Sequence, residues 1–133
     1  MAIRAGALIV ALLACAWFAL GIHQAHDTHQ ASAIVSSAAR LSPRQEAHVD
    51  ALLRSAATLN PDDTLALLRG RAELLAGQPG RAITTLKNLA RQEPLNIEAW
   101  IWLAEAAGGK GPLYQQAIRH VERLDSQEFK RSR

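Results

Sequence analysis

The chain has 133 residues, 49% of them hydrophobic, and a formal net charge of +3, which suits one small domain and leaves no room for a second. Its single cysteine, Cys15, excludes an intrachain disulfide, a thiolate zinc site and a CxxC redox pair. The excess positive charges are spread among neighbours of opposite sign, without the interleaved aromatic residues of a nucleic-acid surface, so no nucleic-acid partner is expected.

The first predicted element is a membrane anchor in residues 1–22. The run AGALIVALLACAWFALGI, Ala5–Ile22, has 18 residues without a charge. As a helix it would be about 27 Å long, close to the ~30 Å hydrocarbon core of a bilayer. Arg4 precedes the run, and no Lys or Arg follows between residues 23 and 39. The positive-inside rule therefore predicts a single pass through residues 5–22, with the N-terminus cytoplasmic and the C-terminal domain extracytoplasmic.

Two alternatives to a permanent anchor both involve cleavage. The sequence LLAC, Leu12–Cys15, resembles a bacterial lipoprotein signal, and Ala14–Ala16 fits an ordinary signal peptidase site. The apolar run continues past Cys15, which favours the uncleaved anchor. Arg outnumbers Lys twelve to three and Ala is abundant, which hints at a GC-rich bacterial source and so at the bacterial inner membrane.

Residues 23–41 are predicted to form a juxtamembrane helix or linker. Within it, His23, His26 and His29 recur every three residues, and three imidazoles on one helix face could bind zinc or copper. The outer two would lie about 9 Å apart along the axis, too far to share one ion without bending the helix. We therefore assign no metal and no cofactor, and we interpret these histidines as a polar collar, with metal binding as the alternative.

Prolines mark the starts of the next predicted elements. The five prolines lie at positions 43, 61, 79, 94 and 112, and proline fits the first turn of a helix but disrupts its interior. Ser42 and Gln45 form a capping box, and Asn60 is a second N-cap. Apolar residues between these marks recur with helical period. We predict an all-α chain with helices near residues 43–59, 62–76, 79–92, 95–107 and 112–125, joined by short loops that make neighbours antiparallel.

The stretch ALLRGRAELLAGQPGRAITTLKNLARQEP, Ala66–Pro94, resembles a tetratricopeptide repeat (TPR), a helix-turn-helix unit of about 34 residues. Arg69 and Glu73 depart from the family pattern, because they occupy positions that are usually apolar. The matching positions, including those of a following unit, are Gly70, Gly77, Ala82, Leu86, Pro94, Trp100, Leu103 and Ala104.

The resemblance implies a fold and a domain organisation. We expect an N-terminal transmembrane helix followed by a short TPR-like α-solenoid of antiparallel helix hairpins. The repeat domain is expected in residues 42–126, and residues 127–133 are expected to form a basic tail that is frayed in solvent.

The resemblance also implies a concave groove, lined by the first helix of each hairpin, that would take a peptide or helix of a partner protein. The residues expected to line it are Thr64, Leu67, Arg71, Leu74, Glu98, Ile101, Trp102 and Glu105. The residues expected to pack the helices together are Gly70, Ala82, Trp100 and Ala104, with Gly70 and Ala82 at the closest approach of the two helices. Trp100 and Trp102 point to opposite sides of one helix, so we expect Trp100 in the core and Trp102 at the groove.

No catalytic arrangement is recognisable, so we expect a protein that is not an enzyme. The remaining histidines, His48 and His120, are isolated and expected at helix surfaces. The first functional hypothesis is a membrane-anchored adaptor or scaffold in an envelope assembly of the polysaccharide, pilus or cytochrome biogenesis type. The alternatives are a metal-binding envelope protein that uses the three clustered histidines, and self-assembly through the anchor and an exposed edge of the helix stack, with the oligomeric state open.

Overall fold

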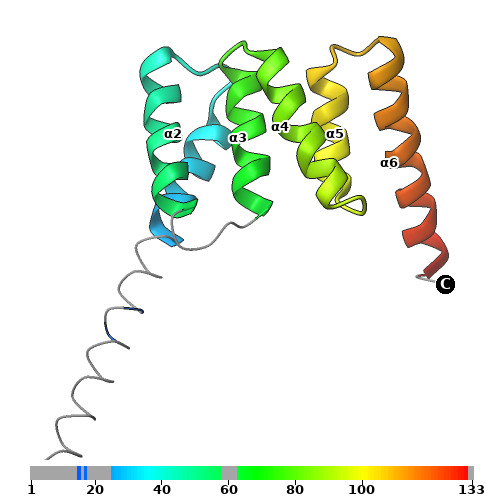
Figure 1. The fold of residues 1–133 in the computed structure, drawn as a ribbon, viewed down its shortest axis with the longest axis horizontal. Coiled ribbons are helices and arrows are strands. Elements are labelled where there is room, and N and C mark those ends of the chain that lie inside the picture. The colour runs from blue at the N-terminus through cyan, green and yellow to red at the C-terminus, as the bar shows by residue number, and fades with distance from the viewer. Residues whose placement is uncertain (1–14, 16, 18–24, 58–62, 132–133) are drawn as a thin grey trace, which may run out of the picture.

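The computed structural model of the chain describes Cys15, Trp17 and residues 25–57 and 63–131, and it describes side chains for all of these except 63 and 127–131. Consecutive helices run antiparallel in a row that ends with α6 (Figure 1). Across the described residues there is no strand, so the predicted all-α architecture is confirmed there. The helices are residues 25–37, α2 (Pro43–Ala57), α3 (Asp63–Leu75), α4 (Pro79–Gln92), α5 (Ile97–Ala106) and α6 (Gly111–Arg131).

The predicted punctuation explains where α2 and α4 begin. The backbone N–H of Ser42 donates to Gln45 Oε1 at 3.0 Å, and the N–H of Gln45 donates to Ser42 Oγ at 3.4 Å, which is the predicted capping box at the start of α2. Pro79 is the first residue of α4, as predicted. The second predicted cap, Asn60, lies outside the described residues.

Pro94 is a correction, because it lies in the turn between α4 and α5 and does not begin a helix. The N-cap of α5 is Asn96, whose side-chain oxygen accepts a hydrogen bond from the N–H of Ala99 at 3.1 Å. An Asn side chain that accepts this bond satisfies one of the free N–H groups of the first turn. The helix therefore begins two residues later than the proline rule suggests.

The C-terminal helix is longer than predicted. Gly108, Gly109 and Gly111 all have positive φ, so the connection before α6 uses a backbone conformation that other residues rarely adopt. From there α6 continues to Arg131. The expectation of a frayed tail is therefore wrong for the backbone of residues 127–131, which is helical.

The core consists of two clusters that share α3. One contains Leu65, Leu68 and Ala72 of α3 and packs them against α2 and residues 25–37. The other contains Leu67 of α3 and packs it with residues of α4, α5 and α6. Helix α3 is therefore apolar on two sides, as expected of an inner helix in a stack.

Residues 25–37 belong to this packed stack. Ala31 is fully buried and Val35 is 2% exposed, both in the cluster with α2 and α3. Leu41, in the connection to α2, is also buried, and its N–H donates to the carbonyl of Leu75 at 3.0 Å. The predicted helix is confirmed, but the packed domain begins before residue 42, the expected boundary.

The predicted anchor, residues 5–22, lies outside the described residues apart from Cys15 and Trp17. Among the helices that the structure does describe, none combines the length and the apolar character needed to cross a bilayer.

Candidate functional site

The α3–α4 hairpin provides a rigid base for the candidate groove. A Cβ atom at Gly70 of α3 would lie 2.6 Å from Cγ and Cδ2 of Leu86 on α4, so the two helices approach closely at this glycine. Ala82 is fully buried in the same hairpin, as expected of a packing residue. The direct neighbour of Gly70 across the hairpin is nevertheless Leu86, a contact that the sequence did not predict.

Helix α5 is fixed through Trp100. This side chain is 7% exposed, and its indole N–H donates to the carbonyl of Pro94 at 3.0 Å. The imidazole of His120, on α6, stacks on the indole with ring centroids 4.0 Å apart and an interplanar angle of 2°. The expectation that His120 is isolated at a helix surface is therefore wrong. The sequence could not show this contact, because it depends on how α6 packs against α5. Ala104, the fourth predicted packing residue, is buried as well.

Two predicted groove residues from different hairpins are in direct contact. The guanidinium carbon of Arg71, on α3, lies 4.5 Å from the ring centroid of Trp102, on α5. Trp102 is half-buried against the core cluster, so the predicted difference between Trp100 and Trp102 is present. A guanidinium over an indole face contributes about 0.5 to 2 kcal/mol, depending on its exposure. The contact therefore ties α3 to α5.

Arg71 keeps unused hydrogen-bonding capacity. Its Nε is buried and has no hydrogen-bond partner among the described residues, and Arg71 makes no ion pair with any of them. A buried donor without a partner costs about 1 to 3 kcal/mol. The side chain as a whole is only half-buried. The exposed part of the side chain therefore lies at atoms other than Nε.

The other predicted groove residues divide by burial. Thr64, Glu98, Ile101 and Glu105 are exposed. Leu67 is a correction, because it is 8% exposed and belongs to the core cluster with α4, α5 and α6. Leu74 is half-buried and packs against the same cluster. The regular spacing of Leu67 and Leu74 with Arg71 predicted one shared face, but the closeness of α5 covers the two leucines.

Ile101 is unusual for its position. Three large apolar side chains are exposed in the described residues. They are Ile101, Trp17 in the apolar run near the N-terminus, and Leu95 in the α4–α5 turn. Ile101 is 45% exposed and precedes Trp102 on α5. An exposed aliphatic residue beside a half-buried tryptophan is a combination that protein interfaces favour.

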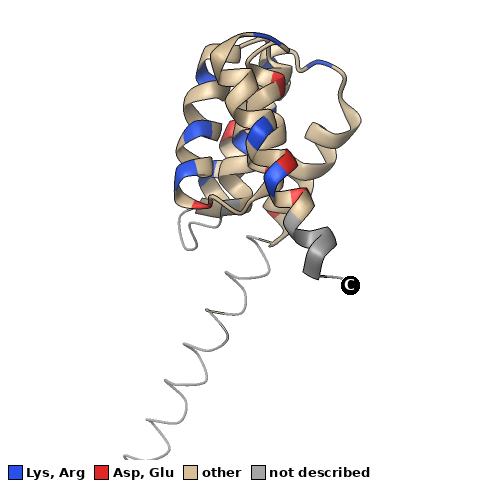
Figure 2. Cartoon of the chain, turned by 90° about the vertical axis from the view of Figure 1, so that its right-hand side faces the viewer, with Lys and Arg blue, Asp and Glu red and all other residues tan. Residues whose placement is uncertain are grey.

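The charges around this face are of both signs. Neither Glu98 nor Glu105 makes an ion pair or hydrogen bond with its side chain in the described part of the chain. Lys and Arg are distributed over several helices, with Asp and Glu among them, in the view of Figure 2. Among the described residues, the predicted groove therefore carries two carboxylates on α5 and one guanidinium, that of Arg71 on α3, none of which forms an ion pair.

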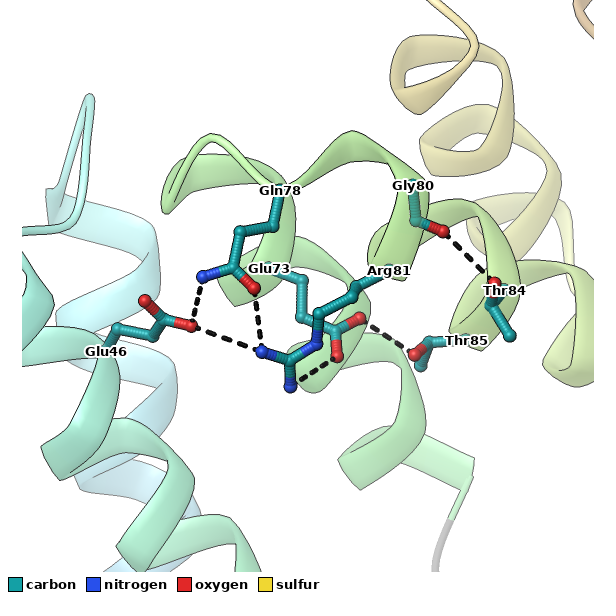
Figure 3. Close-up of polar contacts among 7 residues, drawn as sticks. All are labelled: Glu46, Glu73, Gln78, Gly80, Arg81, Thr84 and Thr85. Atoms are coloured by element: carbon teal, nitrogen blue, oxygen red, sulfur yellow. Dashed lines mark hydrogen bonds and ion pairs between the residues drawn. The ribbon is translucent and has the colours of Figure 1, made fainter.

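A polar network that the sequence did not reveal joins α2 to the α3–α4 hairpin (Figure 3). Glu73 is 4% exposed, yet Thr85 Oγ1 donates to its Oε2 at 2.8 Å and Arg81 Nη2 lies 3.3 Å from its Oε1. Gln78 Nε2 donates to Glu46 Oε1, on α2, at 2.7 Å. Glu73 is one of the departures from the family pattern, and this departure is explained by the partners that satisfy its carboxylate.

The histidine cluster is described only in part. His23 lies outside the described residues, whereas His26 and His29 are exposed on the helix of residues 25–37. A ring nitrogen of His26 is hydrogen-bonded to Gln30 Nε2 at 2.8 Å. Within the described residues, no group of three or more His, Cys, Asp or Glu side chains could hold a metal ion.

Comparison with known proteins gives one match. The family model described as tetratricopeptide repeat matches residues 64–106, which cover α3, α4 and α5 and make up less than half of the chain. Comparison with curated proteins finds no match, and neither does comparison with solved structures. Together with the all-helical stack, the family match supports a TPR-like helical repeat protein, and such repeats bind other proteins.

Proposed function

We propose that the chain is a membrane-anchored, extracytoplasmic adaptor that binds a segment of a partner protein in the groove lined by α3 and α5. In this proposal it serves an envelope assembly of the polysaccharide, pilus or cytochrome biogenesis type, and residues 5–22 hold it in a bacterial inner membrane. The repeat fold supports the binding role, whereas the sequence alone supports the anchor and its orientation.

The observation that carries the binding role is the contact of Arg71 with Trp102, next to which Ile101 is exposed on α5. Tryptophan and arginine are the residue types that most often dominate binding energy at interfaces. Here they are held together across two helices, and an exposed isoleucine adjoins them. Because the buried contacts of Gly70 and Trp100 fix α3 and α5, a partner meets a surface that is already ordered.

Site-specific photocrosslinking in native membranes tests the groove. A photoreactive amino acid at Ile101 of the full chain should give a discrete crosslinked protein. The matched control is Lys87, which is exposed on α4, the second helix of the hairpin. Equal crosslinking from both positions, or none from Ile101, would contradict the proposed groove.

The anchor has its own test. Carbonate extraction should leave the full chain in the membrane fraction, and a reporter enzyme that is active only outside the cytoplasm should be active when fused after Arg133. Release by carbonate or an inactive fusion would overturn the proposed location and would leave the groove proposal standing. Mass spectrometry of the membrane-bound protein would reveal lipidation at Cys15 or cleavage of the leader.

A further inference from the structure

We infer that the groove recognises an amphipathic helix with a basic, acidic, basic order of side chains, in which the acidic residue meets Arg71 and the basic residues meet Glu98 and Glu105. This inference rests on the proposed function, because it specifies the partner of the same groove. It is based on the contact between Arg71 and Trp102 and on the charged side chains that form no ion pair with described residues.

The guanidinium of Arg71 is oriented for a carboxylate. Its Cζ lies 4.5 Å from the ring centroid of Trp102, which holds the group beside α5, and its Nε is buried. Of its three nitrogens only Nε is buried without a partner, so the terminal Nη edge remains accessible. Two parallel N–H donors on this edge match the two oxygens of an Asp or Glu side chain. A stacked guanidinium loses little further freedom when it binds one.

Glu98 and Glu105 determine which partner side chains are favoured on either side of the acidic residue that meets Arg71. Glu98 precedes Trp102 by four residues and Glu105 follows it by three, so all three lie along one side of α5. Both carboxylates are exposed and make no ion pair with described residues. A purely acidic partner would be repelled by them, whereas Lys or Arg at these points would be attracted.

The spacing of the charges favours a helical partner. Glu105 follows Glu98 by seven positions on α5, which corresponds to about 10.5 Å along the helix axis. A helix lying along α5 repeats this spacing with basic residues at i and i+7 and an acidic residue at i+3 or i+4, all on one face. In an extended segment about 3 residues span the same distance, and the two basic side chains would then point to opposite sides. Apolar side chains on the same face of the helix would cover Ile101.

A pair of synthetic helical peptides of about 15 residues tests the inference, since helices shorter than this are marginal in water. One peptide carries Lys, Glu and Lys at i, i+4 and i+7 on an Ala and Leu background, and the other carries Glu, Lys and Glu at the same positions. Fluorescence anisotropy with the full chain in phospholipid nanodiscs should show about tenfold tighter binding of the first peptide.

Charge reversal in the protein provides the decisive comparison. The variant Glu98→Lys with Glu105→Lys changes only exposed, unpaired side chains, so its fold should be retained, and it should lose the preference for the first peptide. Adding Arg71→Glu should reverse the preference. The control Lys87→Glu changes charge on α4 and should leave the preference unaltered.

Two results would overturn the inference. One is equal binding of both peptides to the unmodified chain. The other is binding of neither peptide. If either occurs while Ile101 still crosslinks to a protein partner, the groove function stands and only the charge order is wrong. If crosslinking from Ile101 fails as well, the proposed function fails with it.

Discussion

Adding a single methyl group at Gly70 should lower the stability of the fold. Gly70→Ala would place Cβ 2.6 Å from Leu86 Cγ, and Leu86 is fully buried, so it has little room to move. Overpacking costs about 1 to 3 kcal/mol, whereas the gain in helix propensity is about 1 kcal/mol. We therefore expect a net loss of stability, measured as a lower midpoint of urea unfolding followed by circular dichroism.

The matched control for this substitution is Gly80→Ala. Gly80 is exposed in the first turn of α4, its φ is not positive, and a Cβ there would meet nothing within 4 Å. This variant should be unchanged or more stable by up to about 1 kcal/mol. If Gly70→Ala proves as stable as Gly80→Ala, the close approach of α3 to Leu86 is not a constraint on the fold.

The polar network around Glu73 allows the contributions of Thr85 and Arg81 to the free energy of unfolding to be compared. Thr85→Val leaves a carboxylate oxygen in a 4% exposed residue without its donor, and hydrogen bonds to charged groups contribute about 1.5 to 3 kcal/mol. Arg81→Ala removes ion pairs to Glu73 and Glu46 and a hydrogen bond to Gln78, but the Arg81 side chain is 56% exposed, so each ion pair contributes about 1 kcal/mol or less. We expect Thr85→Val to lower the free energy of unfolding more than Arg81→Ala.

Thr84→Val is the control for this comparison. Its hydroxyl is exposed and donates to the carbonyl of Gly80 within the same helix, so its loss should change the free energy of unfolding by about 0.5 kcal/mol or less. Urea unfolding of the three variants under one set of conditions gives the order. A larger loss for Arg81→Ala than for Thr85→Val would contradict the buried hydrogen bond.

At the scale of elements, α5 is a short helix and should depend on its cap. Asn96→Ala removes the acceptor for the N–H of Ala99 and the 2.7 Å hydrogen bond from Asn96 Nδ2 to Glu93 Oε2. Loss of an N-cap costs about 1 kcal/mol. We expect this loss in urea unfolding, together with faster amide hydrogen exchange at Ala99. Asn96→Ser retains a capping oxygen and should recover most of the stability, and failure to do so would show that the cap is not the cause.

Helix limits were largely predictable because they depend on local chemistry. Proline in a first turn, Ser42 with Gln45, and apolar residues at helical spacing each act within a few residues of the chain. The start of α5 was missed because Pro94 suggested an earlier one, although Asn96 is a capping residue that the sequence displays. The end of α6 was missed because residues 127–133 were expected to form a separate basic tail, whereas the helix continues to Arg131.

Contacts between helices were predictable only where they depend on which residues share one face of a single helix. Burial of Trp100 follows from its spacing with Leu103 and Ala104 on α5. The stack of His120 on Trp100 depends on how α6 lies along α5, and the contact of Arg71 with Trp102 depends on the distance from α3 to α5. Neither quantity is encoded in a local pattern, so the sequence could propose groove residues but not the contacts among them.

For the whole molecule, the final helix limits further stacking. The side of α6 that faces α5 carries its apolar residues, and Ala117 is fully buried there. Between Leu113 and Ser126, the exposed residues of α6 are polar or charged: Gln115, Gln116, Arg119, Glu122, Arg123, Asp125 and Ser126. A polar outer face is what the terminal helix of a repeat stack requires. This edge therefore does not favour the open-ended self-assembly that was one of the alternatives.

The two core clusters predict that the stack unfolds in parts. Leu53 of α2 and Leu103 of α5 are both fully buried, but they lie in different clusters, and among the described helices it is α3 that contributes buried residues to both. Truncation of a buried leucine costs about 2 to 5 kcal/mol. In a linear stack this cost acts mainly on neighbouring helices, because each helix pair contacts only the next. Leu53→Ala should therefore lower the amide-exchange protection of residues 25–57 and spare α5 and α6.

Leu103→Ala should do the reverse and is the matched comparison for Leu53→Ala. Native-state hydrogen exchange by mass spectrometry, resolved to peptides from each helix, measures both variants under the same conditions. Helix α3 should lose protection in both, since it contributes Leu65 and Leu68 to one cluster and Leu67 to the other. If each variant instead lowers protection evenly from residue 25 to the end of α6, the domain is one cooperative unit. The groove between α3 and α5 would then share the stability of the whole stack.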